Sequence, residues 1–248
     1  PVSDENGETV AQVFPGLPAA RFQPASSEPI SQAPELELSC VPPPVKPPVV
    51  APSYAAIVNG HSHALVTKAD ALRDAEAARK EGLALHALLQ HLGRVAPEKR
   101  DIVAPRALDT LLPDRAEHYP RIVDKALGIL GNSAFAGLFG PDSRAELPFR
   151  VPALQAGQKI WLSGRIDRVV VDDSGVLVVD YKSDASVPKG ADGVPGNYLT
   201  QLGLYALVAG QLFPGRPVRA AILWTELESL MKLPDERLAA ARADFTLR

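Results

Sequence analysis

The feature that most constrains the fold is a pair of β-type runs joined by a four-residue polar turn. The runs span residues 159–171 and 176–182, and the turn at 172–175 reads Asp-Asp-Ser-Gly. Runs rich in Val and Ile around a turn that ends in Gly predict a β-hairpin. Helical patterns lie on both sides of this hairpin, so we expect an α/β fold with a mixed sheet of four or five strands.

The hairpin carries charged side chains where a buried strand normally has none. Side chains alternate along a strand, so Asp180 and Lys182 share a face with Val176 and Val178. Unpaired buried charge is costly, and strand pairing would bring Asp167 of the first run close to Asp180. Two carboxylates beside a lysine suit Mg²⁺ or Mn²⁺.

A simpler interpretation of the same residues also exists. Asp167 would then form a surface ion pair with Arg165 or Arg168, and Asp180 and Lys182 would form a solvated strand end. The residues outside the hairpin decide between the two interpretations.

The flanking motifs resemble those of a known nuclease family. Gly164-Arg-Ile-Asp167, then twelve residues, then Asp180-Tyr-Lys182 resembles the core of the restriction-endonuclease-like PD-(D/E)XK superfamily. Gly82-x-x-x-His86, Glu146-Leu-Pro-Phe149 and Gln201-x-x-x-Tyr205 occur in the order found in RecB and AddA helicase-nucleases. The resemblance covers about residues 70–230 and is greatest to the C-terminal nuclease domain of bacterial AddA.

The resemblance implies a role for each residue of the hairpin site. Asp167 would be the central metal ligand and Asp180 the second carboxylate, with His86 and the Tyr181 backbone carbonyl as further ligands. The metal would be Mg²⁺, with Mn²⁺ as the alternative because imidazole is a softer ligand than Mg²⁺ prefers. Lys182 would orient or deprotonate the attacking water, or stabilise the pentavalent phosphate.

Three further residues have both a structural and a functional interpretation. Gln201 and Tyr205 lie four apart on a predicted helix and share a face. Alone they would be polar surface, but the resemblance implies that they pack on the active strand and contact the DNA backbone or the surroundings of Lys182. Glu146 is either an acid near the site or a solvent-facing strand residue.

The spacing of apolar residues and the positions of Gly and Pro predict the remaining helices and strands. Leu85, Leu88, Leu89 and Leu92 form a core stripe, and His86 lies on another face of the same helix as either a core histidine or a ligand. The predicted helices span residues 68–92, 105–112, 121–130, 133–139, 197–209 and 234–242, and the predicted outer strands span 144–151 and 218–225.

The N-terminal part differs in composition from the rest. Residues 1–52 hold 12 of the 24 prolines, which excludes regular helices and predicts an extended or disordered segment. We therefore expect a Pro-rich linker or tether at 1–55 and a nuclease domain at 56–248, although an apolar patch at 10–22 suits docking on the folded part. Because the chain starts with Pro1 and not Met, we expect a fragment of a longer chain, and the resemblance implies an upstream helicase domain and an AddB-like partner subunit.

Composition limits the compartment and the class of protein. An apolar content of 46% with 22% charged residues is typical of a globular protein, and no apolar run approaches the roughly 20 residues of a membrane span. The single Cys40 excludes an internal disulfide framework, so we expect a reducing, cytoplasmic location. A net charge of −3 neither supports nor excludes nucleic-acid binding, because a nuclease to which an attached helicase delivers DNA does not need a strongly basic surface.

The leading hypothesis is a metal-dependent deoxyribonuclease, acting as an exonuclease or endonuclease. It would cut single-stranded DNA during double-strand break end processing and homologous recombination, inside a helicase-nuclease complex. The alternatives are a catalytically idle nuclease-like domain that binds DNA or protein, and a stand-alone endonuclease of the same superfamily.

Overall fold

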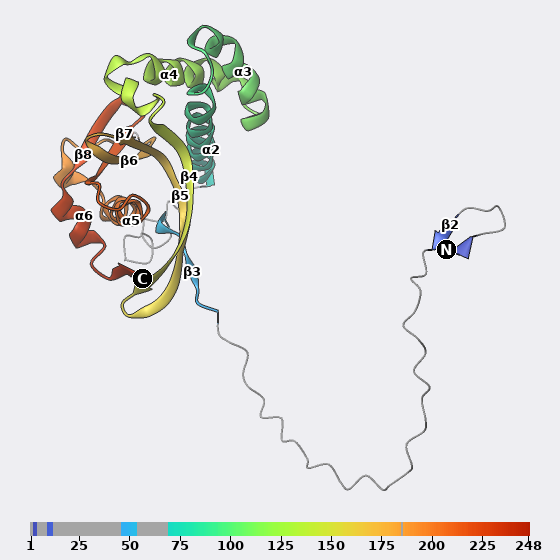
Figure 1. The fold of residues 1–248 in the computed structure, drawn as a ribbon. Helices are drawn as coiled ribbons and strands as arrows, with labels where there is room; N and C mark the ends of the chain where they lie inside the picture. The colour runs from blue at the N-terminus through green and yellow to red at the C-terminus, as the bar shows by residue number, and fades with distance from the viewer. Residues whose placement is uncertain (1, 4–8, 12–45, 54–68, 185) are drawn as a thin grey trace, which may run out of the picture. The chain divides into compact units, whose positions relative to one another are not determined.

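A computed structural model describes residues 2–3, 9–11, 46–53, 69–184 and 186–248 (Figure 1). The chain divides into two units, Pro1–Pro44 and Val45–Arg248. In the first unit the described residues form β1 (Val2–Ser3) and β2 (Thr9–Ala11), which pair antiparallel. Most of the patch predicted at 10–22 lies outside the described residues, and the domain boundary at residue 55 stays a prediction.

The second unit is built on a mixed, seven-stranded sheet. Its order is β8-β7-β6-β5-β4-β9, and β3 pairs with β5 beside this path. Neighbouring pairs are antiparallel except β6 with β7 and β3 with β5. The strands are β3 (Val49–Val50), β4 (Ser143–Gln155), β5 (Gln158–Asp172), β6 (Gly175–Lys182), β7 (Val218–Trp224), β8 (Ser229–Leu233) and β9 (Phe245–Leu247).

Helices cover both faces of this sheet, which confirms the predicted α/β class. In Figure 1, β4 and β5 form a long curved ribbon with α5 on its concave side, while α2, α3 and α4 gather on the other side. The helices are α2 (Ala69–Leu92), α3 (Arg100–Leu111), α4 (Tyr119–Gly131), α5 (Gly196–Leu212) and α6 (Asp235–Ala241), with short 3₁₀ turns at Pro97–Lys99, Ala116–His118, Ser133–Leu138 and Ala191–Gly193.

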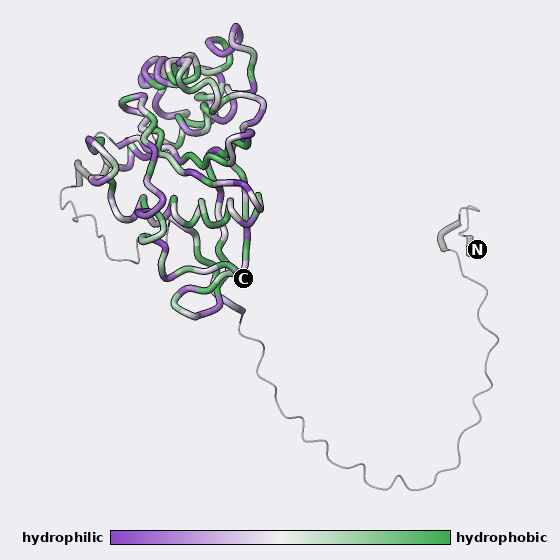
Figure 2. Tube along the Cα trace, turned by 60° about the vertical axis from the view of Figure 1, so that its left-hand side comes forward, coloured by the Kyte–Doolittle hydropathy of each residue, from purple (hydrophilic) through white to green (hydrophobic). Residues whose placement is uncertain are grey.

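The sheet separates two hydrophobic cores, and β6 contributes alternate residues to each. Val176 and Val178 pack in the core that contains α5, whereas Val179 and Tyr181 pack in the core that contains α2, α3 and α4. The period-2 alternation of a strand explains this division. Figure 2 shows hydrophobic stretches within the sheet and its covering helices, and hydrophilic stretches at the periphery.

The structure confirms some boundaries and corrects others. The leucine stripe of α2 is buried, as its spacing predicts. Helix α3 begins at Arg100, five residues before Pro105, so the expected start at residue 105 was wrong; Pro105 lies inside the helix. The expected count of four or five strands was too low, since β3, β8 and β9 are short edge elements. In the described part of the chain, no helix is both long and apolar enough to span a bilayer.

The hairpin turn lies at residues 172–175, as predicted, and its conformation requires glycine at position 175. Asp172 accepts hydrogen bonds from the backbone N–H and hydroxyl of Ser174. Gly175 has a φ of +127°, and a Cβ atom at this position would lie 2.3 Å from the Pro217 carbonyl oxygen. Only glycine therefore allows the start of β6 to approach the segment that leads into β7.

Candidate active site

The two strands of the hairpin stop pairing just before the acidic residues. The ladder between β5 and β6 runs from Asp172–Gly175 to Arg168–Val179 and ends there. Beyond this point the Tyr181 N–H donates to the Asp167 carboxylate, with a distance of 2.8 Å to Oδ2. The Asp167 carboxylate thus accepts the hydrogen bond that a backbone carbonyl of β5 would accept in a continued ladder. Asp167 and Asp180 lie where β5 and β6 separate.

Asp180, Lys182 and Gln201 form one polar network under α5. Asp180 is only 2% exposed, and its Oδ2 lies 2.6 Å from Lys182 Nζ. Gln201 donates from Nε2 to Asp180 Oδ1 at 3.0 Å and accepts from Lys182 Nζ at Oε1, also at 3.0 Å. A buried charge pair is tolerated only with such additional hydrogen bonds. The glutamine amide thus fixes both charged groups at once.

Tyr205 supports this network from the next turn of α5. Its hydroxyl lies 3.1 Å from Gln201 Nε2, and its ring packs edge-on against Phe149 with 5.9 Å between centroids. Tyr205 is buried, and burial raises the pKa of its hydroxyl, so the group stays protonated. The geometry favours a contact with the surroundings of Lys182 over a contact with DNA.

Asp167 and His86 meet on the other side of the gap. His86, on α2, places Nδ1 3.9 Å from Asp167 Oδ2, and its ring is edge-on to Tyr181 at 5.3 Å. Burial and then the nearby Asp180 carboxylate raise the pKa of Asp167 to about 8. Burial lowers the pKa of His86 to about 4, so its imidazole is neutral at pH 7.

Glu146 lies near the site in an unusual backbone conformation. Its φ is +51°, which non-glycine residues rarely adopt, and its carboxylate is 3.2 Å from Arg165. The negative charge of Glu146 also contributes to raising the pKa of Asp167. The structure therefore places Glu146 close enough to influence Asp167 but paired with a cation.

Two residues near Lys182 were not predicted. Lys182 Nζ lies 4.4 Å from the centre of the Tyr198 ring, a cation–π contact, and the Tyr198 hydroxyl donates to both carboxylate oxygens of Asp184 at 2.9 and 3.1 Å. Tyr198 precedes Gln201 by three residues and so lies on the same helix face. An aromatic residue at this spacing was the signal available in the sequence.

A cavity of about 340 Å³ opens beside these groups. Gly82, His86, Lys182 and Tyr198 contribute to its lining. A Cβ atom on Gly82 would lie 2.6 Å from the hydroxyl of Ser183, so the glycine allows α2 to approach the end of β6. Lys182 therefore faces an open cavity.

The donor atoms of the site suit a hard divalent cation. No group of three or more His, Cys, Asp or Glu side chains among the described residues is arranged as a ready metal cluster. The available donors are nonetheless two carboxylates, a neutral imidazole and strand carbonyls. Such oxygen-rich sets bind Mg²⁺ and Mn²⁺.

Comparisons with known proteins agree with this arrangement. The family model of the PD-(D/E)XK nuclease superfamily matches residues 61–244. The chain is similar to an ATP-dependent helicase/nuclease subunit of Desulforamulus reducens, with 29% identity over 162 residues, which cover 58% of this chain and 13% of that protein. The crystal structure of SSO0001 aligns over 65% of this chain and 82% of its own, with 17% identity and a TM-score of 0.31.

Proposed function

Because the chain belongs to the PD-(D/E)XK nuclease superfamily, we propose that it hydrolyses phosphodiester bonds of single-stranded DNA in a divalent-metal-dependent reaction. The observation that carries this proposal is the network of Asp180, Lys182 and Gln201, placed opposite Asp167 where β5 and β6 separate. Buried charges at strand ends are costly, and clusters of such charges are typical of functional sites. This cluster therefore supports an active site at the end of β6.

Four groups of the chain would hold the metal. These are the carboxylates of Asp167 and Asp180, the imidazole of His86 and the backbone carbonyl of Tyr181. Mg²⁺ is the expected ion, with Mn²⁺ as the alternative because of the imidazole ligand. When bound, the metal supplies an activated water and neutralises charge on the phosphate. The lowered pKa of His86 supports its role, since a neutral imidazole has a free lone pair at pH 7.

Lys182 acts on the attacking water and the phosphate. The Gln201 amide, the Asp180 carboxylate and the Tyr198 ring hold its ammonium at one edge of the cavity. The ammonium has three N–H groups, of which Gln201 and Asp180 take two, so one remains to orient the water, while its positive charge stabilises the charge that develops on the phosphate. Gln201 and Tyr205 position Lys182 and do not touch the reacting atoms.

We assign the chain to a helicase-nuclease that processes DNA ends during double-strand break repair. The similarity to the helicase/nuclease protein of Desulforamulus reducens supports this assignment, although the chain spans only 13% of that relative. The nucleotide-binding motif G-x-x-x-x-G-K-[ST] does not occur in the 248 residues, so a motor would come from another domain. An AddB-like subunit is the proposed partner, and the cytoplasm the proposed location.

The test is cutting of end-labelled single-stranded and double-stranded DNA with Mg²⁺, Mn²⁺ or EDTA. We expect metal-dependent cutting of the single strand, lost in EDTA and reduced at least about 1,000-fold by Asp180→Asn or Lys182→Ala. Asp173→Asn and Lys159→Ala change exposed residues of the same hairpin and should cut as the wild type does.

A folded but inactive wild type would be tested further by calorimetry of Mg²⁺ and Mn²⁺ binding, with Asp167→Ala as control. Metal binding that Asp167→Ala abolishes, without cutting, would mean that DNA must be delivered by a partner. If the chain neither binds metal nor cuts DNA, the nuclease proposal is wrong and the idle, DNA-binding or protein-binding module replaces it.

A further inference from the structure

We propose that a second cavity, next to the catalytic groups, binds a backbone phosphate of the DNA strand through Arg168, Arg94 and Arg144. This cavity has a volume of about 480 Å³ and lies between the end of α2, the start of β4 and the middle of β5. The three arginines come from these three segments. The inference rests on the proposed function, because it assigns a substrate subsite to the same nuclease.

Arg168 is a buried cation whose observed partners are all neutral. Its side chain is 4% exposed and donates to the Tyr181 hydroxyl at 2.5 Å, the Ser143 hydroxyl at 2.9 Å and the Leu89 carbonyl at 3.3 Å. In the part of the chain that the structure describes, no carboxylate forms an ion pair with it. Guanidinium stays protonated in proteins, and a buried charge normally has an opposite charge nearby. An anion is therefore the partner that this site lacks.

The guanidinium is held ready for such a ligand. It carries five N–H groups, of which the hydrogen bonds above use three, so two remain for an anion. The group also stacks on the Phe139 ring at 4.6 Å, which fixes its plane. Planar guanidinium groups bind phosphate with two parallel hydrogen bonds.

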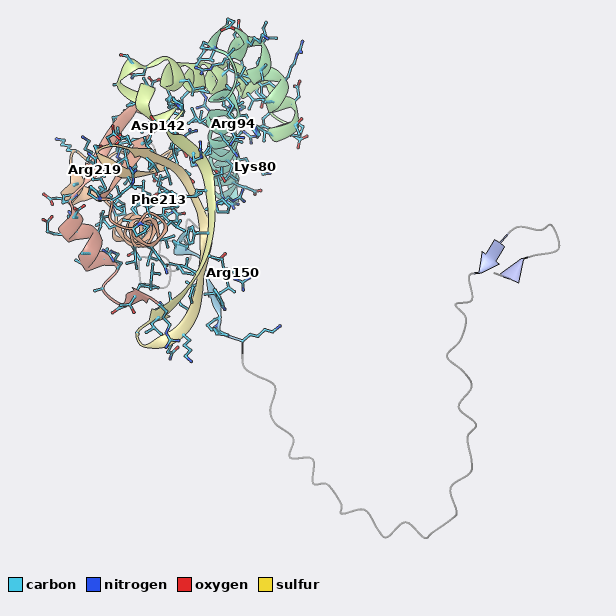
Figure 3. The ribbon with its side chains drawn as sticks, in the orientation of Figure 1. Lys80, Arg94, Asp142, Arg150, Phe213 and Arg219 are labelled. Carbon is cyan, nitrogen blue, oxygen red and sulfur yellow. The ribbon has the colours of Figure 1, made fainter. Side chains whose placement is uncertain are left out.

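The charge of the cavity lining points to the same class of ligand. Its charged side chains are Arg94, Arg144 and Arg168, and no acidic residue lines it. Arg94 and Arg144 are exposed, so they bring positive charge to the entrance at little desolvation cost. Asp142, labelled with Arg94 in Figure 3, is exposed and lies outside the lining. The cavity thus selects an anion.

The position of the cavity identifies the anion as part of the nucleic acid. Gln90 in its lining lies four residues after His86 on α2, which is just over one helical turn or about 6 Å along the axis. Arg168 follows Asp167 directly in β5, and it bonds the hydroxyl of Tyr181, whose N–H bonds Asp167. The first cavity is lined by Gly82 and His86 and the second by Gln90 and Gly93, so a DNA strand that runs along α2 from the first cavity would place a neighbouring phosphate at Arg168.

The test measures binding of the 248-residue chain to a fluorescent single-stranded oligonucleotide in EDTA, at several salt concentrations. The double variant Arg94→Gln/Arg144→Gln should bind at least about 10-fold more weakly than the wild type. Its plot of log K against log salt should be shallower by about 0.7 for each phosphate that the variant no longer neutralises. The double variant Arg106→Gln/Arg219→Gln removes the same charge from exposed positions elsewhere and should change affinity less than about 3-fold.

Two further measurements distinguish the binding of a single phosphate in the cavity from non-specific electrostatic attraction between the protein and the DNA. Oligonucleotides with a single uncharged methylphosphonate, moved along the strand, should weaken wild-type binding at one position and leave Arg94→Gln/Arg144→Gln unaffected there. Arg168→Lys keeps the charge but loses the paired hydrogen bonds, so it should also weaken binding, provided that urea unfolding shows a native fold.

The outcomes distinguish this inference from the nuclease proposal. Equal reductions of affinity in the two double variants, an unchanged salt slope, or absent wild-type binding would overturn the phosphate site. Cutting of saturating DNA by the wild type, lost in Asp180→Asn, would still support the nuclease. Position-specific binding without cutting and without binding of Mg²⁺ or Mn²⁺ would support the phosphate site and contradict the nuclease.

Discussion

Gln201 offers the sharpest test of how the site is held together. Its amide donates to Asp180 and accepts from Lys182, both at 3.0 Å, and the residue is 8% exposed. Gln201→Leu keeps a side chain of similar size and removes both bonds to the charged groups, together with the bond to the Tyr205 hydroxyl. We expect this substitution to destabilise the fold and to release Lys182 from its position.

The magnitude follows from the burial of the two charged groups. A hydrogen bond to a charged group contributes about 1.5–3 kcal/mol, so the two together contribute about 3–6 kcal/mol. The Lys182 side chain is 16% exposed and can bond to water instead, whereas that of Asp180, at 2%, cannot. We therefore expect the lower end of the range, a loss of about 3 kcal/mol in the free energy of unfolding.

The assay is urea unfolding in EDTA, followed by cutting kinetics with metal. Gln211→Leu is the matched control, because Gln211 lies on the same helix, is exposed and bonds only weakly to the Arg248 carbonyl at 3.4 Å. Its free energy of unfolding should change by less than about 0.5 kcal/mol. For Gln201→Leu, kcat should fall about 100-fold, or about 2.7 kcal/mol, with little change in KM. Equal stability of the two variants would refute the reasoning.

Three further predictions concern other parts of the domain. In EDTA the free energy of unfolding should fall as pH rises from about 6.5 to about 8, because Asp167 keeps its proton in the folded state to a higher pH than in the unfolded state; below about 6.5 the lowered pKa of His86 acts in the opposite direction. Urea unfolding of Asp167→Asn should lose this slope; an unchanged slope would contradict the assignment. Gly175→Ala should destabilise by about 2–3 kcal/mol in urea because of its positive φ and the nearby Pro217 carbonyl, whereas Gly210→Ala, in open space on α5, should stabilise by about 0.5–1 kcal/mol. Tyr198→Phe keeps the ring over Lys182 and should retain most of kcat, while Tyr198→Leu should lower it about 5-fold or more; similar values for both would exclude the cation–π contact as the cause.

The elements with strong periodic patterns could be predicted from the sequence. The leucine stripe predicts the buried face of α2, whose end at Leu92 agrees with the prediction, and the Asp-Asp-Ser-Gly turn predicts the β5–β6 hairpin. The structure also brings together His86, Asp167, Asp180, Lys182 and Gln201, which come from two helices and two strands. Their convergence was expected from the family motifs, since spacing along a chain does not specify contacts between distant elements.

Other features had no local signal. Strands β3, β8 and β9 have two to five residues, too few for an alternating pattern, and β3 is Val49–Val50 between prolines. Proline at 105 suggested a helix start, but packing of α3 against α2 and α4 outweighs the missing hydrogen bond. Arg168 was expected, at most, to pair with Asp167, whereas it turns to the α2 side and bonds Leu89 and Tyr181.

The two aspartates of the site are held in opposite ways. Asp180 is surrounded by the Lys182 ammonium and the Gln201 amide, so its negative charge is stabilised by the chain itself. Asp167 receives one backbone N–H, lies close to Asp180 and Glu146, and has a raised pKa. The Lys182 side of the site is therefore ordered by protein contacts alone. The Asp167 side holds negative charge only at a free-energy cost, which a cation next to its carboxylate would relieve.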